Sequence, residues 1–266
     1  MSTDRALEYV QSLARGLSVI SCFSERRPAM TISAVAEATG LSRATARRVL
    51  HTLQQLDLVA TDGEVFRLTP RVLSIGYAYL SSLELPELAH PHMEQLVAQV
   101  HESSSLAVLD GADIVYVARV PTKRIMSVAI TVGTRLPAFA TSMGRALLAD
   151  RTPAEVEELL GTGPLPALTA RTVRTPADLR RVLDRVRDEG FALTDQELED
   201  GLRSIAVPVR DARGVARAAL NVAAHAGRVS AQAMVEEFLP PLLEAAFRIE
   251  TDVRHRPGAA ASSLVR

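Results

Sequence analysis

The sequence predicts an α+β protein of two domains: an N-terminal winged helix-turn-helix, a linker helix, and a sensor-like second domain of strands mixed with helices. Three observations predict this fold class. Residues 31–68 follow a helix–glycine–helix–hairpin pattern, an apolar helix begins at Pro70, and strands mix with helices from residue 104 onward. The chain has 266 residues, enough for two domains with separate cores.

Composition places the chain among globular proteins, because 47% of its residues are hydrophobic and 23% are charged. The formal net charge is -1, so a nucleic-acid surface must be local. Cys22 is the only cysteine, which excludes a disulfide framework or a cysteine-based zinc cluster and suits a reducing cytoplasm. No signal peptide or bilayer-spanning run is visible. We therefore expect a cytoplasmic protein with no membrane partner. We expect no cofactor, and with Cys22 as the only cysteine we see no zinc ligand set.

The first domain is predicted from short-range signals. Residues 31–40 predict a short helix that Thr31 caps and Gly40 ends. Residues 42–56 predict a second helix, whose apolar stripe consists of Ala46, Val49, Leu50, Leu53 and Leu56. Asp62-Gly63 lies between two short β-prone segments and predicts a hairpin. This order of elements is typical of a winged helix-turn-helix.

The outer face of the second helix carries side chains that a recognition helix presents to DNA. Arginine can fork onto guanine or neutralise phosphate, and small hydroxyls fit close to the DNA backbone. The candidate DNA-binding residues are Thr31, Ser42, Arg43, Thr45, Arg47, Arg48, His51 and Arg67. The alternative is a solvated, arginine-bearing face on a small helical domain. The coincidence of short helix, glycine turn, basic second helix and wing favours DNA.

Two further helices are predicted around this unit. Val10, Leu13, Leu17 and Ile20 predict a first helix that packs on the helix-turn-helix. Pro70 suits the first position of a helix that runs to about residue 83 and is apolar on several sides. We interpret the latter as a linker and dimer helix. Simple packing onto the chain's own two domains is the alternative, and both can hold.

The second domain is predicted to contain both strands and helices. Pro86 interrupts the helical pattern before a helix over 91–101. Strands are predicted over 106–109, 114–120, 125–132, 191–194, 204–210 and 215–224, and helices over 140–149, 153–160, 176–189 and 230–254. The Ala/Ser-rich tail is predicted to be disordered. The predicted boundaries are 1–69 for the DNA-binding domain, 70–86 for the linker, 87–256 for the effector domain and 257–266 for the tail.

Two polar segments in the second domain, residues 140–145 and 194–204, form a candidate small-molecule site. The first begins a helix, whose free N–H groups and partial positive charge suit a carboxylate. The second is an acidic loop that returns into a strand, and together they are able to close a pocket around a small acid. The alternative is that Thr141 or Ser142 only caps the helix and that the loop is solvated. Spacing alone does not decide between them.

From about Tyr9 to Arg254 the chain resembles the IclR family of bacterial transcriptional regulators. The segments that carry the resemblance are TISAVAEATGLSRATARRVLHTLQQLDLV, IVYVARV, VGTRLPAFATSMGRALLA and FALTDQELEDGLRSIAVPVRD. The motifs GTRLPAFATSMGRALLA and DQELEDGLRSIAVPV resemble the branch that controls aromatic-acid catabolism, the β-ketoadipate-pathway and hydroxybenzoate regulators.

The resemblance implies a GAF-like effector domain, a homodimer on double-stranded operator DNA, often assembled to a tetramer, and a small carboxylate effector, either an aromatic acid or β-ketoadipate-like. It implies effector contacts at Ile125, Val128, Thr141, Ser142, Met143, Thr194, Asp195, Leu202 and Ser204. Glyoxylate-type members have smaller residues at positions 142 and 143 and an acid at position 194, which argues against glyoxylate or pyruvate. Regulation of another small-carboxylate pathway is the alternative.

Two rival functions come from other classes. An enzyme would need an acid, a base and a nucleophile, for which His225, Asp195, Glu197 and Ser142 are the candidates. No G-x-S-x-G, H-E-x-x-H or Walker motif is present, so we do not expect an enzyme. A purely architectural DNA binder needs only charge, and the long second domain argues against it.

Overall fold

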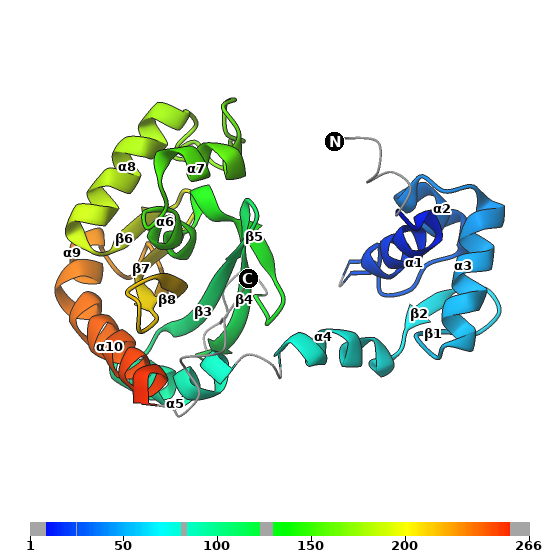
Figure 1. The fold of residues 1–266 in the computed structure, drawn as a ribbon, viewed down its shortest axis with the longest axis horizontal. Helices are drawn as coiled ribbons and strands as arrows, with labels where there is room; N and C mark the ends of the chain where they lie inside the picture. Colours follow the sequence, from blue (N-terminus) through cyan, green and yellow to red (C-terminus); the bar gives the residue numbers. More distant parts are fainter. Residues whose placement is uncertain (1–8, 25, 81–83, 123–129, 256–266) are drawn as a thin grey trace. The chain divides into compact units, whose positions relative to one another are not determined.

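The computed structural model describes residues 9–24, 26–80, 84–122 and 130–255. The chain divides into two compact units, Met1–Ser82 and Leu83–Arg266 (Figure 1). None of the described helices combines the length and the apolarity needed to cross a bilayer.

The first unit is a winged helix-turn-helix. Its elements are α1 (Gln11–Ser21), α2 (Ile32–Thr39), α3 (Arg43–Gln55) and the antiparallel hairpin of β1 (Val59–Thr61) and β2 (Phe66–Leu68). The predicted caps are confirmed: Thr31 accepts the N–H of Ala34, and Ser42 accepts the N–H of Thr45. Gly40 ends α2 in the left-handed conformation with φ 68°, which glycine adopts at little cost.

Helix α1 is present, but three of the four residues predicted to pack on the helix-turn-helix are exposed. Val10, Leu13 and Leu17 are 60%, 62% and 51% exposed, whereas Val19 is fully buried. Val19 and Phe23 belong to the core shared with α2 and α3, and of the four predicted residues only Ile20 packs against that core. Leu56 is likewise exposed, because α3 ends one residue before it.

The segment after the wing differs in detail from the prediction. A 3-10 turn (Pro70–Val72) leads into α4 (Leu73–Leu80), and α5 spans Glu84–Val100. Pro86 therefore lies in the first turn of α5, where a missing N–H costs no intrahelical bond. Pro91, expected to begin a helix, lies inside α5.

The second unit is built on one antiparallel sheet with the strand order β5-β4-β3-β8-β7-β6 (Figure 1). The strands are β3 (Ser103–Asp110), β4 (Asp113–Val120), β5 (Arg135–Pro137), β6 (Ala192–Asp195), β7 (Leu202–Arg210) and β8 (Ala216–His225). The helices are α6 (Ser142–Leu148), α7 (Pro153–Leu160), α8 (Pro176–Glu189), α9 (Ala231–Ala233) and α10 (Leu239–His255), with a 3-10 turn at Ala138–Ala140.

Each face of the sheet has its own apolar core. Helices α5 and α10 cover one face, with Met93, Leu220 and Leu242 buried between them. Helices α6, α7 and α8 cover the other, with Met143 and Leu183 buried there. A π-helical turn, Met234–Phe238, precedes α10. The prolines that follow it lack the N–H groups needed to continue a regular α-helical ladder.

Two segments predicted from the sequence lie largely or wholly outside the residues that the structure describes. The strand expected over 125–132 lies largely outside the described residues, and residues 130–134 form a turn instead. The third strand in chain order is β5, where Asp113 pairs with Pro137. The predicted disordered tail also lies outside the described residues.

Candidate functional site

The outer face of α3 carries free cationic groups. Arg43, Arg47 and Arg48 are exposed, and within the described residues their guanidinium groups have no hydrogen-bond or ion-pair partner. The apolar face of the helix is buried through Ala46, Leu50 and Leu53, so the arginines point outward. Unpaired guanidinium groups on the second helix of a helix-turn-helix are suited to phosphates and base edges.

The remaining DNA-binding candidates have local partners. The Ser42 and Thr45 hydroxyl oxygens lie 2.9 Å apart at the first turn of α3, while Thr31 caps α2. The His51 ring packs edge-on against Phe66 of the wing, with ring centroids 6.0 Å apart. Arg67 pairs with Asp62 at 2.9 Å, and both side chains are about half exposed. Such an exposed pair is weak, so a phosphate can compete for Arg67.

A cavity in the second unit lies between the sheet and the beginning of α6. Strands β3, β4, β6, β7 and β8, the start of α6 and the loop before β7 line it, together with Ile130. The residues lining it are Ser105, Tyr116, Arg119, Ile130, Ala140, Thr141, Ser142, Met143, Thr194, Leu198, Leu202, Ser204, Asn221 and Ala223. The free space is about 20 Å³, room for roughly one water molecule.

A buried polar network forms the floor of this cavity. Ser204 Oγ lies 2.8 Å from Ser142 Oγ, and the Asn221 side-chain amide donates to Ser204 Oγ at 2.9 Å. The Asn221 side-chain oxygen in turn accepts the N–H of Ser105 at 2.9 Å. All four residues are at most 6% exposed. The network therefore joins α6 to strands β3, β7 and β8.

Arg119 also lines the cavity, and its cationic side chain was not among the residues predicted from the sequence. Leu106 pairs with Ala118 but Ala107 pairs with Tyr116, so Val117 is an extra, bulged residue in β4. Val117 and Ala118 both pack into the α5/α10 core. The bulge thereby turns Arg119 to the same face as Tyr116, a known role of bulges near functional sites.

The positive charge of the Arg119 guanidinium has few partners among the described residues. Its only hydrogen bond in the described part of the chain is a 3.4 Å contact to Ser105 Oγ, and it has no carboxylate partner there. Burial lowers the pKa of its guanidinium below the usual value, although Tyr116 opposes the shift. Burial also raises the pKa of Tyr116 to about 12, so the phenol stays protonated at neutral pH. Together they offer donors to an anion.

Most of the predicted effector residues meet in this cavity. Thr141, Ser142, Met143, Thr194, Leu202 and Ser204 line it. Ile125 and Val128 lie outside the described residues. Asp195 is not among the lining residues: it follows Thr194 in β6 and is bonded by Arg203 at 2.7 Å and Arg171 at 3.0 Å. Strand alternation explains this, because neighbouring residues point to opposite faces.

The loop over the cavity is tied to α6 by a buried ion pair. Arg145 is 1% exposed and contacts both carboxylate oxygens of Glu197, at 2.6 and 2.5 Å. Its Nε donates to the Phe139 carbonyl at 2.8 Å, and Glu197 also accepts the N–H of Val173 at 3.2 Å. This pair fixes the segment that carries Leu198 into the cavity wall.

The four residues considered for catalysis have separate structural partners. Ser142 bonds Ser204, Asp195 and Glu197 bond arginines, and His225 Nδ1 accepts the N–H of Gly227 at 3.1 Å. Within the described residues none of the four bonds another. The structure does not bring them together as a nucleophile with its acid and base.

Comparison with known proteins identifies the family of both domains. Residues 12–63 match the IclR helix-turn-helix domain, and residues 77–251 match the bacterial transcriptional regulator IclR C-terminal domain. The chain belongs to the IclR family. The matched helix-turn-helix includes α2 and α3, and a helix-turn-helix regulator implies a DNA-binding first domain.

Three IclR-family relatives are especially informative. The chain is 46% identical over 239 residues to the Pca regulon regulatory protein of Pseudomonas putida, covering 90% of this chain and 82% of the relative. It is 39% identical over 245 residues to the p-hydroxybenzoate hydroxylase transcriptional activator of Acinetobacter baylyi, covering 90% of each. The solved IclR homolog from Microbacterium hydrocarbonoxydans, complexed with 4-hydroxybenzoate, is 32% identical with a TM-score of 0.80, covering 95% of this chain and all of that one.

Proposed function

We propose that this protein regulates genes of aromatic-acid catabolism, binding operator DNA through α3 and the wing and an aromatic or β-ketoadipate-like carboxylate in the cavity beside α6. It acts in the cytoplasm, as a regulator rather than an enzyme. The observation that carries the ligand class is Arg119, a partly buried cation facing the cavity without a carboxylate partner in the described chain. The names of the relatives support the aromatic class.

The polar groups of the cavity are arranged for an acid with an apolar body. Arg119 and the Tyr116 hydroxyl bind the carboxylate, which restores the charge balance that burial of Arg119 disturbs. Met143, Leu198 and Leu202 pack against the apolar body. The hydroxyl groups of Ser142, Thr194 and Ser204 form hydrogen bonds with hydroxyl groups of the ligand.

Binding requires the cavity to widen. About 20 Å³ of free space is far less than an aromatic acid occupies, so the first turn of α6 or the loop before β7 must move. A ligand that binds the widened form better shifts the population toward it. We infer that this shift, transmitted through the segment over residues 70–86, alters the spacing of the recognition helices, which must be about 34 Å or a multiple of it.

This spacing requirement implies a homodimer, and the first unit offers an apolar surface for it. Tyr9, Leu13 and Leu17 recur every fourth residue and are more than half exposed, as are Leu73 and Ile75 of α4. Exposed large apolar residues spaced along one face of a helix are suited to contact with a partner. We infer that a second copy covers them, with pairs of dimers forming a tetramer. The domains proposed remain 1–69, 70–86, 87–256 and the tail 257–266.

Fluorescence anisotropy on the DNA upstream of the gene tests this function directly. The titration is run at fixed salt, with and without protocatechuate, 4-hydroxybenzoate and β-ketoadipate. We expect specific binding whose affinity changes with one of these acids. Specific binding that no acid alters would place the effector in another carboxylate class. Absence of specific binding would overturn the proposal and lead to enzyme assays on small acids.

The role of Arg119 is tested with Arg119→Gln and with Arg174→Gln as the matched control, since Arg174 is exposed and lies outside the cavity. We expect Arg119→Gln to lower the affinity for the effector about tenfold or more, which corresponds to the loss of a charged hydrogen bond. Arg174→Gln should leave the effector response unchanged. Equal effects of the two variants would remove Arg119 from the ligand site.

A further inference from the structure

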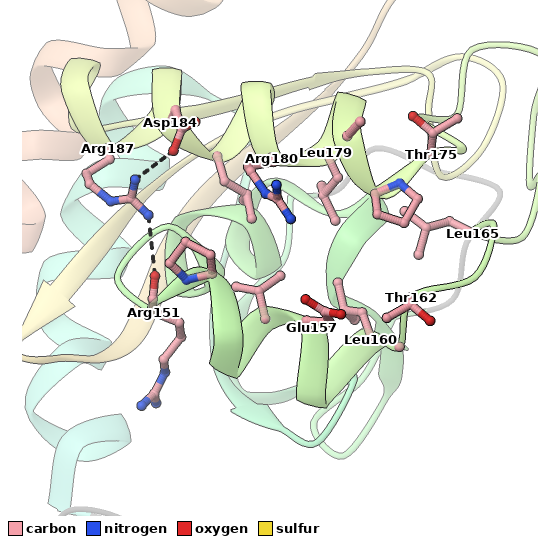
Figure 2. Close-up of a pocket in the computed structure, with 16 residues that line it drawn as sticks. Arg151, Glu157, Leu160, Thr162, Leu165, Thr175, Leu179, Arg180, Asp184 and Arg187 are labelled. Atoms are coloured by element: carbon pink, nitrogen blue, oxygen red, sulfur yellow. Dashed lines mark hydrogen bonds and ion pairs between the residues drawn. The ribbon is translucent and has the colours of Figure 1, made fainter.

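A second cavity lies between α7 and α8 and shares no residue with the cavity beside α6 (Figure 2). Its volume is about 420 Å³, within the usual range of small-molecule sites. The floor is apolar and consists of Val156, Leu160, Leu165, Leu179 and Leu183. We call this cavity the α7/α8 groove.

Most charges around the α7/α8 groove are already paired. Arg187 Nη1 contacts Asp184 at 2.8 Å, and its other nitrogens donate to the carbonyls of Ala149 at 2.9 Å and Arg151 at 3.3 Å (Figure 2). The Arg151 guanidinium is 4.0 Å from Glu155. The Arg187 bonds to the two carbonyls join α8 to the segment before α7, and Arg187, Asp184 and Arg151 each already have a partner.

Two opposite charges remain free. Arg180 extends from α8 and Glu157 from α7, on opposite walls of the groove (Figure 2). Neither side chain has a hydrogen-bond or ion-pair partner in the part of the chain that the structure describes. The groove thus presents a cation on one wall and an anion on the other, and leucine and valine side chains also line it.

We propose that the α7/α8 groove is a second ligand site, for a hydroxy-substituted aromatic acid. The carboxylate binds the Arg180 guanidinium, which matches a carboxylate with two parallel N–H groups. The ring packs on the leucine floor. The hydroxyl at the far end donates to the Glu157 carboxylate, which accepts but cannot donate when ionised. A plain apolar acid satisfies only one of the two charges, so the groove selects for a donor opposite the carboxylate.

The position of the groove gives this site a physical connection to the first cavity. Arg187, in the groove wall, bonds the carbonyl of Ala149 directly after α6. The other end of the same helix supplies Thr141, Ser142 and Met143 to the first cavity. Helix α6 therefore lines the first cavity at one end and is joined at the other end to α8, which forms a wall of the groove. Ligand binding in the groove does not depend on the function proposed for the first cavity.

Methyl NMR of the full-length protein, labelled at leucine and valine, resolves the two sites separately. Titration with 4-hydroxybenzoate is expected to shift the methyl signals of the five floor residues. Arg180→Ala should weaken this local binding about tenfold, as expected for a lost charged hydrogen bond. Arg185→Ala is the matched control: Arg185 is an exposed arginine of the same helix that does not line the groove and has no partner in the described chain. Shifts confined to Leu198 and Leu202, or equal effects of the two variants, would overturn the site.

The role of Glu157 has its own test. The same titration with 4-methoxybenzoate, which lacks the donor, should show weaker binding in the groove than 4-hydroxybenzoate. In Glu157→Ala the difference between the two compounds should disappear. Equal binding of both compounds to the unaltered groove would overturn the proposed selection, and no saturable shift with either would show that the groove binds no acid of this class.

Discussion

The hydroxyl oxygens of Ser142 and Ser204 lie 2.8 Å apart and join the first turn of α6 to β7. Ser204 also accepts from Asn221 and donates to the Val222 carbonyl at 3.2 Å, so its position is fixed by the sheet. Ser142 is the member of this pair that belongs to α6. A ligand that separates the two hydroxyls would move the helix relative to the sheet.

We expect Ser142→Leu to abolish the effector response while DNA affinity without effector stays within about twofold. Leucine adds volume to a cavity with about 20 Å³ of free space and removes one partner of Ser204. Anisotropy titrations with and without effector measure both quantities. Ser142→Ala is the control, because it removes the hydroxyl without filling the cavity. A normal response in Ser142→Leu would exclude the start of α6 from the effector site.

Gly144→Ala should destabilise the effector domain. An added Cβ would lie 2.1 Å from the carbonyl oxygen of Ala138, which is backbone and cannot move aside as a side chain would. We expect a loss of about 1–3 kcal/mol or more in the free energy of unfolding, the usual cost of overpacking. Gly163→Ala is the control, since nothing lies within 4 Å of its Cβ. Chemical denaturation compares the two variants. Equal stability of the two variants would mean that the backbone turn at residues 138–140 moves to accommodate the added methyl group at little cost.

Glu197→Gln leaves the buried Arg145 guanidinium without a compensating charge. Removing one partner of a buried pair costs about 3–5 kcal/mol, far more than an exposed pair contributes. Arg181→Ala breaks the exposed pair with Asp178 and should change stability far less, because solvent screens an exposed pair. Urea unfolding of the full-length variants measures both. A loss in Glu197→Gln no larger than the loss in Arg181→Ala would contradict the role of this pair.

The contrast between predicted and observed elements has a consistent physical cause. Features set by neighbouring residues were predicted: the caps at Thr31 and Ser42, the left-handed Gly40, and the wing at Asp62-Gly63 all follow from short-range chemistry. The side of α1 that is buried was not, because it depends on which partner fills the core. The burial of Val19 rather than Leu13 is a tertiary effect.

The same distinction applies to the cavity. Ser142 and Thr194 were recognised because polar residues interrupt apolar segments, and family resemblance named their positions. Arg119 also interrupts an apolar strand, IVYVARV, but simple alternation places it on the face opposite Tyr116. Only the bulge at Val117 reverses this, and a bulge depends on the pairing of β3 with β4. Asp195 shows the converse, since it directly follows Thr194 in β6 and, by strand alternation, points to the opposite face.

Acid should destabilise the effector domain partly through Asp211. Burial alone would raise the pKa of this carboxyl, but hydrogen bonds from Arg217, Val215 and Arg213 lower it overall below its usual value of 3.8. A carboxyl whose pKa is lower in the folded state stabilises the folded protein at pH values above its unfolded-state pKa. That contribution is lost as the pH falls through the folded-state pKa. The stability gap between wild type and Asp211→Asn should therefore shrink as pH falls below about 3.8. Denaturant melts across this range measure the gap, and a gap independent of pH would contradict the shift.

Arg47→Ala should weaken operator binding while leaving effector affinity unchanged. Arg47 is exposed on α3, and its guanidinium has no partner within the described residues, so no folded contact is lost. We expect a cost of about 1–3 kcal/mol on operator DNA if Arg47 forks onto guanine, with less discrimination at that base pair. If it contacts phosphate, affinity should fall on all sequences alike and the salt slope should decrease by about 1. Arg181→Ala, which removes one positive charge from the effector domain, is the control. Unchanged DNA affinity in Arg47→Ala would show that α3 enters the groove with a different face.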